Sequence, residues 1–354
     1  MQSDFLIVGG GAVGLNTALT LLQAGYRVTV VERGLAGKEA SWAGGGILSP
    51  LCSWDYQPSV TQLTQRSMAQ FEAASASLYA HTGVDTEYQR SGMLVVPPVA
   101  TASAVAWCAQ HQVPVQSVDL SHYFAELSGE GLLLPDIAQV RNPRLLRALG
   151  MRVVQLGGQI LEQHDVQQLE IVGDQVVAVH TTQGKLTAGA YIVAAGTWSN
   201  TVLGEHALKL DIRPIRGQIL LLKFASPPMA HIVVREGLYL IPRRDGHVLI
   251  GSTLEEVGFD KAVTSNARDS LFERACQLYP DWRKQPIIEH WAGLRPGSIN
   301  NIPTIGRHAQ INNLYANTGH FRYGVTMSFA SAELLLNEIE GNAQPFDVAA
   351  YRWM

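Results

Sequence analysis

The glycine pattern G-x-G-x-x-G at residues 9–14 lies between a short apolar run, residues 4–8, and an apolar helical pattern, residues 13–23. A second apolar run, residues 27–32, follows the helical pattern. Both runs are apolar on both faces, as strands of a buried parallel sheet are. The pattern therefore predicts a βαβ unit at the start of the chain, with the glycines in the turn between the first strand and the helix.

Each glycine of this turn has a distinct physical role. Gly9 permits the tight turn, Gly11 lets backbone N–H groups approach a pyrophosphate, and Gly14 allows close packing of helix on strand. The phosphates would lie at the positive N-terminus of the helix. Glu32 ends the second strand, where a carboxylate accepts hydrogen bonds from adenosine ribose hydroxyls and repels the 2′-phosphate of NADP. The alternative is a structural turn without ligand, and the surrounding strands, helix and Glu32 favour a dinucleotide. NAD and FAD share the ADP moiety, so this motif alone does not distinguish them.

Size and charge limit the remaining function classes. The chain has 354 residues, enough for two domains, and a formal net charge of -4. No stripe of Lys and Arg is present that could follow a phosphate backbone, so nucleic acid is not expected as a partner. The three cysteines, Cys52, Cys108 and Cys276, are far apart and have neither disulfide-framework nor metal-ligand spacing. Sparse cysteines are typical of a reducing compartment, so we expect a cytoplasmic protein without a metal site.

One apolar stretch, residues 5–25, is long enough to cross a bilayer. It contains the glycine-rich turn and polar residues such as Asn16 and Thr17, and no basic segment precedes it. The strand, turn and helix described above account for it better than a membrane span.

The order of elements along the chain predicts a discontinuous domain. Parallel α/β pieces are expected at the start, over residues 145–196, and at the end, with helices at residues 58–81, 143–149, 266–278 and 328–337. Antiparallel strands are expected over residues 218–251. We therefore predict an α/β fold in which a Rossmann-type parallel-sheet domain is threaded through a second, mainly antiparallel-sheet domain. The first would comprise residues 1–80, 140–215 and 290–354, and the second residues 81–139 and 216–289.

Four further motifs follow in order at residues 40–48, 292–296, 303–306 and 319–324. They read Ala-Ser-Trp-Ala-Gly-Gly-Gly-Ile-Leu, Ala-Gly-Leu-Arg-Pro, Pro-Thr-Ile-Gly and Gly-His-Phe-Arg-Tyr-Gly. With the glycine-rich turn, they make the chain resemble the FAD-dependent D-amino-acid oxidase family, and within it the glycine-oxidising members of bacterial thiamine-thiazole biosynthesis. The resemblance extends from Asp4 to about Leu336. It implies a Rossmann-type FAD domain and an antiparallel sheet that covers the flavin.

The resemblance also implies FAD as a non-covalent cofactor, because residues 297–303 contain no cysteine like the one that holds flavin covalently in related sarcosine oxidases. Residues 12–13 would meet the pyrophosphate, residues 32–33 the adenosine, and residues 320–326 the pyrimidine end of the flavin. The full set of implied cofactor residues is Gly9, Gly11, Ala12, Val13, Gly14, Glu32, Arg33, Ala40, Ser41, Gly45, Gly46, Ile47, Val166, Gly196, His320, Phe321, Arg322, Tyr323, Gly324, Val325 and Thr326.

For the substrate, the resemblance implies that Arg295 clamps a carboxylate, since a guanidinium makes two parallel charge-assisted bonds to it. Tyr239 would add a hydroxyl, Arg322 would border the amine, and Leu254 and Ile47 would line the pocket. The structural alternatives are an interdomain salt bridge for Arg295 and simple strand packing for Tyr239. His320 is interpreted as a positional residue of the flavin segment and not as a base. Tyr323 departs from the family, which often has a smaller polar residue there.

The implied reaction oxidises glycine, with sarcosine or small D-amino acids as further substrates, by hydride transfer to N5 of FAD. O₂ and water would then yield the oxo acid, ammonia and H₂O₂. A D-amino-acid or sarcosine dehydrogenase with another electron acceptor, a nicotinamide-linked dehydrogenase, and a flavin domain acting in tRNA modification are the alternatives. The sequence leaves open the preferred substrate, the electron acceptor, the pathway and the oligomeric state, and a homo-oligomer is compatible with it.

Overall fold

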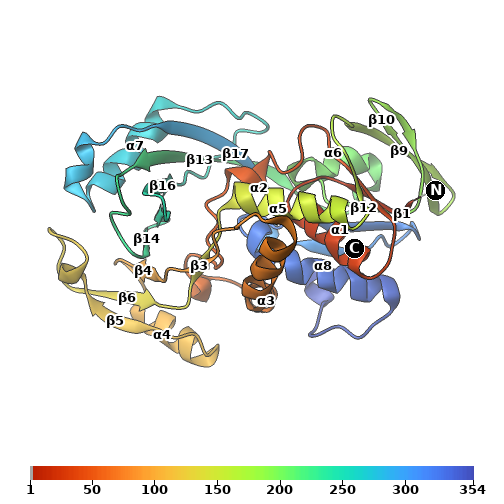
Figure 1. The fold of residues 1–354 in the computed structure, drawn as a ribbon. Helices are drawn as coiled ribbons and strands as arrows, with labels where there is room; N and C mark the ends of the chain where they lie inside the picture. The colour runs from red at the N-terminus through yellow and green to blue at the C-terminus, as the bar shows by residue number, and fades with distance from the viewer. Residues whose placement is uncertain (1–2) are drawn as a thin grey trace.

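The computed structural model describes residues 3–354 and contains two large sheets that lie side by side (Figure 1). The first has six strands, of which five are parallel and the edge strand β18 is antiparallel to its neighbour β19. Its strands are, in spatial order, β18 (Thr304–Arg307), β19 (Leu314–Thr318), β12 (Ala188–Val193), β1 (Ser3–Val8), β2 (Val28–Val31) and β8 (Gln159–Leu161). The predicted βαβ unit at the start of the chain is therefore confirmed.

Both faces of this parallel sheet are covered. In β1, Phe5 and Ile7 point into one core, and Leu6 and Val8 point into another, as strand alternation requires. The first core is closed by the helices α1 (Ala12–Gln23), α3 (Pro58–Thr82), α5 (Asn142–Gln155) and α8 (Gly324–Glu340). The second is closed by a separate antiparallel sheet of β9 (Val166–Val172), β10 (Gln175–Thr181) and β11 (Gly184–Leu186).

That antiparallel sheet corrects one expectation. Residues 145–196 were predicted as a parallel α/β piece, but only β8 and β12 of this stretch join the parallel sheet. In the sequence, the turn residues Gly173 and Asp174 lie between two β-rich runs and predict a hairpin, and these residues do connect the antiparallel strands β9 and β10. The closing helix α8 begins at Gly324, earlier than the predicted Ser328, so its N-terminus lies inside the glycine and aromatic motif at residues 319–324.

The second large sheet has eight strands and is antiparallel except for the β14–β4 pair. In spatial order its strands are β17 (Glu289–Gly297), β13 (Arg213–Lys223), β16 (His247–Gly251), β15 (Leu238–Pro242), β14 (Ile232–Arg235), β4 (Met93–Val95), β6 (Glu130–Leu134) and β5 (Gln116–Asp119). The helix α7 (Ser265–Cys276) packs on one face. The other face carries Tyr239 and Ile241 and meets Ile47 of the first half and the helix α4 (Thr101–Gln110), which the sequence analysis did not predict.

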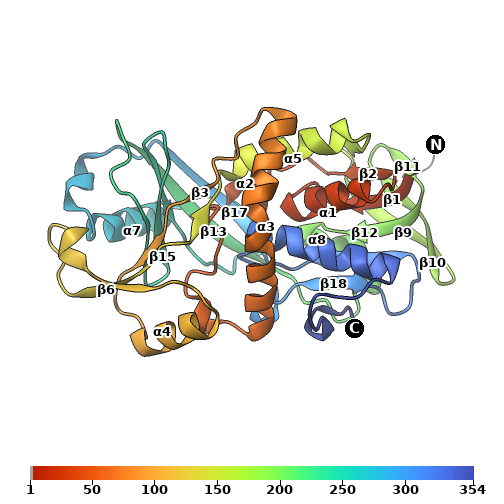
Figure 2. The ribbon, with the colours of Figure 1, turned by 60° about the horizontal axis from the view of Figure 1, so that its bottom comes forward.

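The division into two domains remains a prediction, and the sheets refine where a boundary would fall. Residues 290–297 were assigned to the cofactor domain, whereas β17 pairs along its length with β13 in the eight-stranded sheet. Figure 2 shows α3 lying between the two halves of the molecule. The short strands β3 (Gln89–Arg90) and β7 (Ala138–Gln139) and the short helices α2 (Ala40–Ala43) and α6 (Ser199–Leu203) complete the fold with seven 3₁₀ turns. Within residues 3–354, no helix has the length and apolar character needed to cross a bilayer.

Candidate cofactor and substrate site

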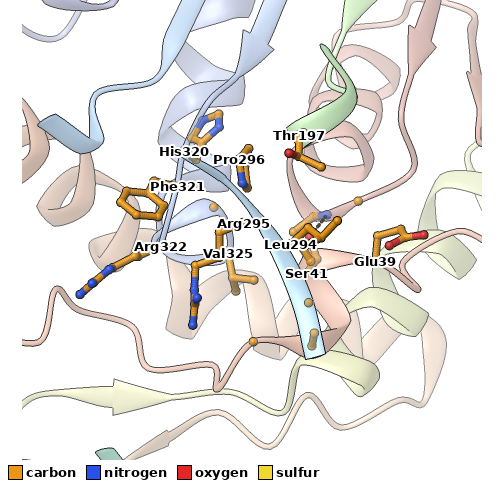
Figure 3. Close-up of a pocket in the computed structure, with 18 of the residues that line it drawn as sticks. Glu39, Ser41, Thr197, Leu294, Arg295, Pro296, His320, Phe321, Arg322 and Val325 are labelled. Carbon is orange, nitrogen blue, oxygen red and sulfur yellow. Dashed lines mark hydrogen bonds between the residues drawn. The ribbon is translucent and has the colours of Figure 1, made fainter. Parts of the chain in front are cut away.

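A cavity of about 430 Å³ lies where the carboxyl ends of β1, β2, β12 and β19 meet the eight-stranded sheet. Ligands of open α/β sheets bind at these strand ends, because the loops and helix N-termini that follow the strands converge there. Figure 3 shows side chains from β17, from the segment before α8 and from the loop after β2 around it. Every residue predicted from the sequence for the site lines this cavity except Gly14.

Gly14 has a packing role instead. A Cβ at this position would overlap the backbone of Gly9 and would lie 3.5 Å from the Ala194 side chain. Gly9 itself has a φ of 115°, and a Cβ there would lie 2.7 Å from the carbonyl carbon of Ala194. Both glycines therefore allow α1 to start close against β12.

The N-terminus of α1 opens onto the cavity. The backbone N–H of Ala12 donates to Ser41 Oγ at 3.0 Å, and Val13 also lines the cavity. A Cβ on Gly11 would meet only Ser41 Oγ, at 3.2 Å, so the backbone is accessible from the cavity. The first turn of a helix has N–H groups without helical partners and a positive dipole end. This arrangement suits a pyrophosphate.

Glu32 is held in place by two backbone donors. Its Oε2 accepts from Gly10 N at 2.8 Å and its Oε1 from Gly34 N at 3.0 Å, and the side chain is buried against the cavity. Each carboxylate oxygen has two lone pairs, so each retains one for a further donor. The carboxylate therefore has acceptor capacity for the two hydroxyls of a ribose, and this role of Glu32 stays a prediction.

A stacked pair that the sequence analysis missed lies next to Glu32. The guanidinium carbon of Arg33 lies 3.4 Å from the centre of the Trp198 ring, and its Nη2 donates to Glu39 Oε1 at 2.8 Å. Trp198 and Thr197 follow β12 directly after Gly196, so their position after a buried strand could have identified them. Val166, predicted to contact adenine, starts β9 and lines this end of the cavity.

The glycine-rich segment at residues 44–47 is hydrogen-bonded to Asn142, the first residue of α5. The Asn142 amide donates to Ser41 O at 2.7 Å and to Gly44 O at 3.0 Å. Gly46 has a φ of 77°, and a Cβ there would lie 2.6 Å from Asn142 Oδ1. No sequence motif identifies Asn142, since its role depends on contacts with residues about a hundred positions away in the chain.

The segment before α8 closes the opposite side of the cavity. His320 is buried, its Nε2 has no hydrogen-bond partner, and burial lowers its pKa to about 3, so it is neutral at pH 7. Phe321 has a φ of 45° and its N–H donates to Pro296 O at 3.0 Å, which joins this segment to β17. The N-terminus of α8 at Gly324 lies at the cavity and presents a positive dipole end there.

Tyr323 lines the cavity but is directed partly into the core. Its hydroxyl donates to the Tyr56 hydroxyl, the two rings pack edge to face at 5.3 Å, and burial raises its pKa. Arg322 is exposed, with its guanidinium carbon 5.6 Å from the centre of the Phe321 ring. The large residue at position 323 is therefore accommodated by Tyr56, which lies just before α3.

Arg295 projects from β17 into the cavity. Its Nη2 donates to Ser252 Oγ at 2.7 Å and its Nη1 to Thr253 O at 3.2 Å, and no carboxylate forms an ion pair with it among residues 3–354. Burial lowers its pKa, Tyr239 acts to raise it, and the charge of Arg322 lowers it further. Arg295 is partly buried, and a cation that is held only by neutral oxygens is suited to binding an anion. The salt bridge considered as the alternative role of Arg295 is therefore not found among the described residues, 3–354.

Tyr239 lies beside Arg295 on the same face of the sheet. Its ring packs over Gly251 of β16, where a Cβ would lie 2.6 Å from the tyrosine oxygen. Ile47 and Leu51 line the cavity near this end, and Leu254 lines it while remaining 53% exposed. Ser252, Thr253 and Leu51 are further lining residues that the sequence analysis did not name.

The residues around the cavity fit FAD. Four buried polar atoms of lining residues have no hydrogen-bond partner within residues 3–354: Asn142 Oδ1, Thr197 Oγ1, Asn317 Oδ1 and His320 Nε2. The glycines at positions 9, 11, 45 and 46 leave the backbone approachable, and Glu32 and the N-terminus of α1 supply the groups that an ADP moiety requires. An elongated dinucleotide with a tricyclic ring would satisfy both ends.

Comparisons with known proteins agree with this site. The FAD-dependent oxidoreductase family of the D-amino-acid oxidase (DAO) type matches residues 4–337. A glycine oxidase of Pseudomonas aeruginosa is 40% identical over 99% of this chain and 98% of its own length. A bifunctional ThiO/ThiG protein of Trichormus variabilis is 30% identical over 96% of this chain and 53% of its own length.

Among solved structures, a glycine oxidase of Geobacillus kaustophilus has a TM-score of 0.94 at 25% identity and covers 100% of this chain and 99% of that one. The family match decides between the two cofactors that share an ADP moiety, so a nicotinamide-linked dehydrogenase is excluded. The chain belongs to the DAO family of FAD-dependent oxidoreductases.

Proposed function

We propose that this protein is a glycine oxidase that converts glycine, water and O₂ to the oxo acid, ammonia and H₂O₂. The observation that carries the proposal is the Arg295 guanidinium, which faces the cavity beside Tyr239 without a carboxylate partner. The full-length relatives named glycine oxidase support the choice of substrate.

Arg295 binds the substrate carboxylate through two parallel N–H···O bonds. Tyr239, which lies on the same face of the sheet, donates a third hydrogen bond to the carboxylate. Arg295 and Tyr239 together fix the orientation of the substrate carbon. The chemistry that bound FAD would supply is the acceptance of a hydride from that carbon and the transfer of the electrons to O₂. The protein contributes orientation and electrostatics, and no paired carboxylates are required in the site.

His320 is assigned to contact with the cofactor and not to proton transfer. A side chain whose pKa is lowered to about 3 is a weak proton acceptor at neutral pH. The backbone carbonyl of Arg322 remains our candidate for accepting a hydrogen bond from the substrate amine. The positive N-terminus of α8 favours negative charge at the adjacent end of the flavin.

We also propose that FAD is held without a covalent bond and that the product serves thiamine-thiazole biosynthesis. None of Cys52, Cys108 and Cys276 is among the residues that line the cavity in the described chain. Acid denaturation should therefore release intact FAD into the supernatant, and flavin that precipitates with the chain would contradict the non-covalent assignment. The match to the bifunctional ThiO/ThiG proteins supports the pathway.

A substrate panel tests the activity. Glycine, sarcosine, D-alanine and L-alanine are added to the purified yellow protein without oxygen, and loss of the flavin absorbance is followed. Glycine should bleach the flavin fastest, and air should then restore the colour and yield H₂O₂. Bleaching by glycine without O₂ uptake would identify a dehydrogenase with another acceptor. A flavin that no amino acid reduces would favour a role on another macromolecule, such as tRNA.

A further inference from the structure

Arg243 is a buried cation at the end of β15 that neither the sequence motifs nor the proposed chemistry uses. It is 5% exposed, and its direct hydrogen-bond partners are all neutral oxygens. Its Nη2 donates to Gly45 O at 2.7 Å, and its Nη1 donates to Gln139 Oε1 at 2.7 Å and to Val140 O at 2.9 Å. Burying a charge without a counter-ion is costly, so such a residue needs an explanation.

The nearby carboxylates do not pair with Arg243. Glu87 and Asp245 bind Arg141 instead, at 3.2 and 2.7 Å. Burial lowers the pKa of Arg243 to about 10, which leaves it charged at neutral pH. The planar guanidinium therefore donates to Gly45 O and Val140 O at the same time in a fixed geometry. A lysine ammonium cannot reproduce this geometry.

The three acceptors belong to two segments, residues 45–47, which line the cavity, and residues 139–140, which are not among the lining residues. Val140 N donates to Gly46 O at 2.9 Å, and Ile47 bridges Gln139, so residues 45–47 and 139–140 form a short antiparallel pair. Arg243 binds both members of this pair. A Cβ on Gly46 would overlap Val140 O, which shows how closely the two segments approach.

Arg243 also connects residues 45–47 to the end of β15, the strand that contains Tyr239. Arg243 directly follows β15 and continues its alternation, so Tyr239, Ile241 and Arg243 point to the same face. All three face Gly45: a Cβ there would lie 2.6 Å from Ile241 Cδ1 and 3.2 Å from Tyr239 Cε2, and Gly45 O accepts from Arg243. One strand thus holds both the tyrosine at the substrate and the anchor of the flavin segment.

We propose that Arg243 is a positioning residue that fixes residues 45–47 against β15, and thereby sets the separation between the flavin and the substrate held by Tyr239 and Arg295. The proposal rests on the proposed function only in its assignment of Tyr239 and Arg295 to the substrate. Arg243 touches neither substrate nor reacting atoms in this role.

The test uses Arg243→Lys and Arg243→Met, with Arg244→Met as the matched control. Arg244 is the adjacent arginine, is 48% exposed in its side chain, and binds Asp85 and Tyr88 O at the surface. Circular dichroism and thermal unfolding establish that each variant is folded. Three quantities are then measured: the Kd for FAD of the apoprotein, the limiting rate of anaerobic flavin reduction by glycine with FAD saturating, and inhibition by acetate.

Arg243→Lys keeps the charge and loses the fork, so the Kd for FAD should rise at least about tenfold and the limiting reduction rate should fall at least about tenfold. In Arg243→Met the Kd for FAD should rise further and the limiting reduction rate should fall further than in Arg243→Lys. The inhibition constant of acetate should stay within about threefold, because Arg295 and Tyr239 remain on their own strands. Arg244→Met should match the wild type in all three.

A folded Arg243→Lys protein with unchanged FAD affinity and reduction rate, even if less heat-stable, would overturn the proposal. Loss of FAD affinity with an unchanged reduction rate would limit Arg243 to cofactor retention and would overturn the coupling to Tyr239. If both variants fail to fold, Gln139→Leu, which removes one acceptor of Arg243, should weaken FAD binding about threefold or more, and wild-type affinity would overturn the role. If glycine does not reduce the wild-type flavin, the proposed function fails while the FAD measurements still decide whether Arg243 holds the segment.

Discussion

Gly217 of β13 leaves open the space that the Arg295 guanidinium occupies. A Cβ added to Gly217 would overlap both terminal nitrogens and the central carbon of that guanidinium. The two residues face each other because β13 and β17 pair in register, with Gly217 opposite Gly293 and Arg295 two residues further along the same face. The orientation of the clamp therefore depends on the absence of a side chain on the neighbouring strand.

Gly217→Ala should displace Arg295 without removing it. Overpacking of this kind costs about 1–3 kcal/mol, which corresponds to a loss of about fivefold to a hundredfold in kcat/KM for glycine, mainly through KM. FAD binding should be retained, because the methyl group meets Arg295 and not the cofactor segments. Gly150→Ala, in α5 with nothing closer than 3.8 Å to the new methyl group, is the control for a glycine substitution. Wild-type kinetics in Gly217→Ala would show that Arg295 has room to move.

Arg295→Ala should lower kcat/KM for glycine by about thirtyfold to a few thousandfold, since removal of one partner of a buried charge pair costs roughly 2–5 kcal/mol. Arg295→Lys keeps the charge but not the planar fork and should fall between Arg295→Ala and the wild type. Steady-state kinetics measure both, and the visible spectrum checks that flavin is retained. A colourless Arg295→Ala protein, or one that oxidises glycine normally, would contradict the clamp and make Arg322 the next candidate.

The parts of the site that are predictable from the sequence are those determined by local spacing and hydrophobic periodicity. Gly9, Glu32 and their strands were predictable because local spacing and hydrophobic periodicity determine them. Arg295 and Tyr239 were named through a resemblance, and their placement on the same face of one sheet became visible only with the pairing of β13, β15, β16 and β17.

Gly217, Asn142 and Arg243 could not be found in this way. Each acts through a partner far away in the chain: Gly217 through Arg295, Asn142 through Gly44, and Arg243 through Gly45. No local period or motif encodes such contacts, since they arise only when segments far apart in the chain pair or pack in the folded protein. In the antiparallel sheet of β9, β10 and β11, the turn between β9 and β10 has a local signal in Gly173 and Asp174, whereas the separation of these strands from the parallel sheet is visible only in the strand pairing.

Glu32→Ala should weaken FAD binding by more than about tenfold, because two hydrogen bonds to a charged acceptor at roughly 1.5–3 kcal/mol each are lost. The same change also removes the acceptor of Gly10 N and Gly34 N, so Glu32→Gln, which keeps one oxygen, should lose less affinity. Titration of apoprotein with FAD measures both, and Glu130→Ala at an exposed site is the control. Equal affinity in Glu32→Ala and the wild type would remove Glu32 from the ribose site.

His320 should make the apoprotein sensitive to acid. Its folded pKa is lowered to about 3, below the value of about 6.5 expected in the unfolded chain, so the unfolded chain takes up a proton that the folded chain excludes. The stability that this residue contributes is complete above pH 6.5 and is lost as the pH falls towards 3, by about 1.4 kcal/mol per pH unit.

His320→Gln removes this proton uptake, so the free energy of unfolding should fall less steeply between pH 6.5 and 4.5 than in the wild type. Denaturant titrations of the two apoproteins at several pH values measure the difference, which cancels the contributions of His290 and His308 because both remain in the variant. His122→Gln, at an exposed site away from the cavity, should keep the wild-type slope. Equal slopes in wild type and His320→Gln would mean that His320 takes up its proton in the folded protein, and a proton-transfer role for this residue would then have to be reconsidered.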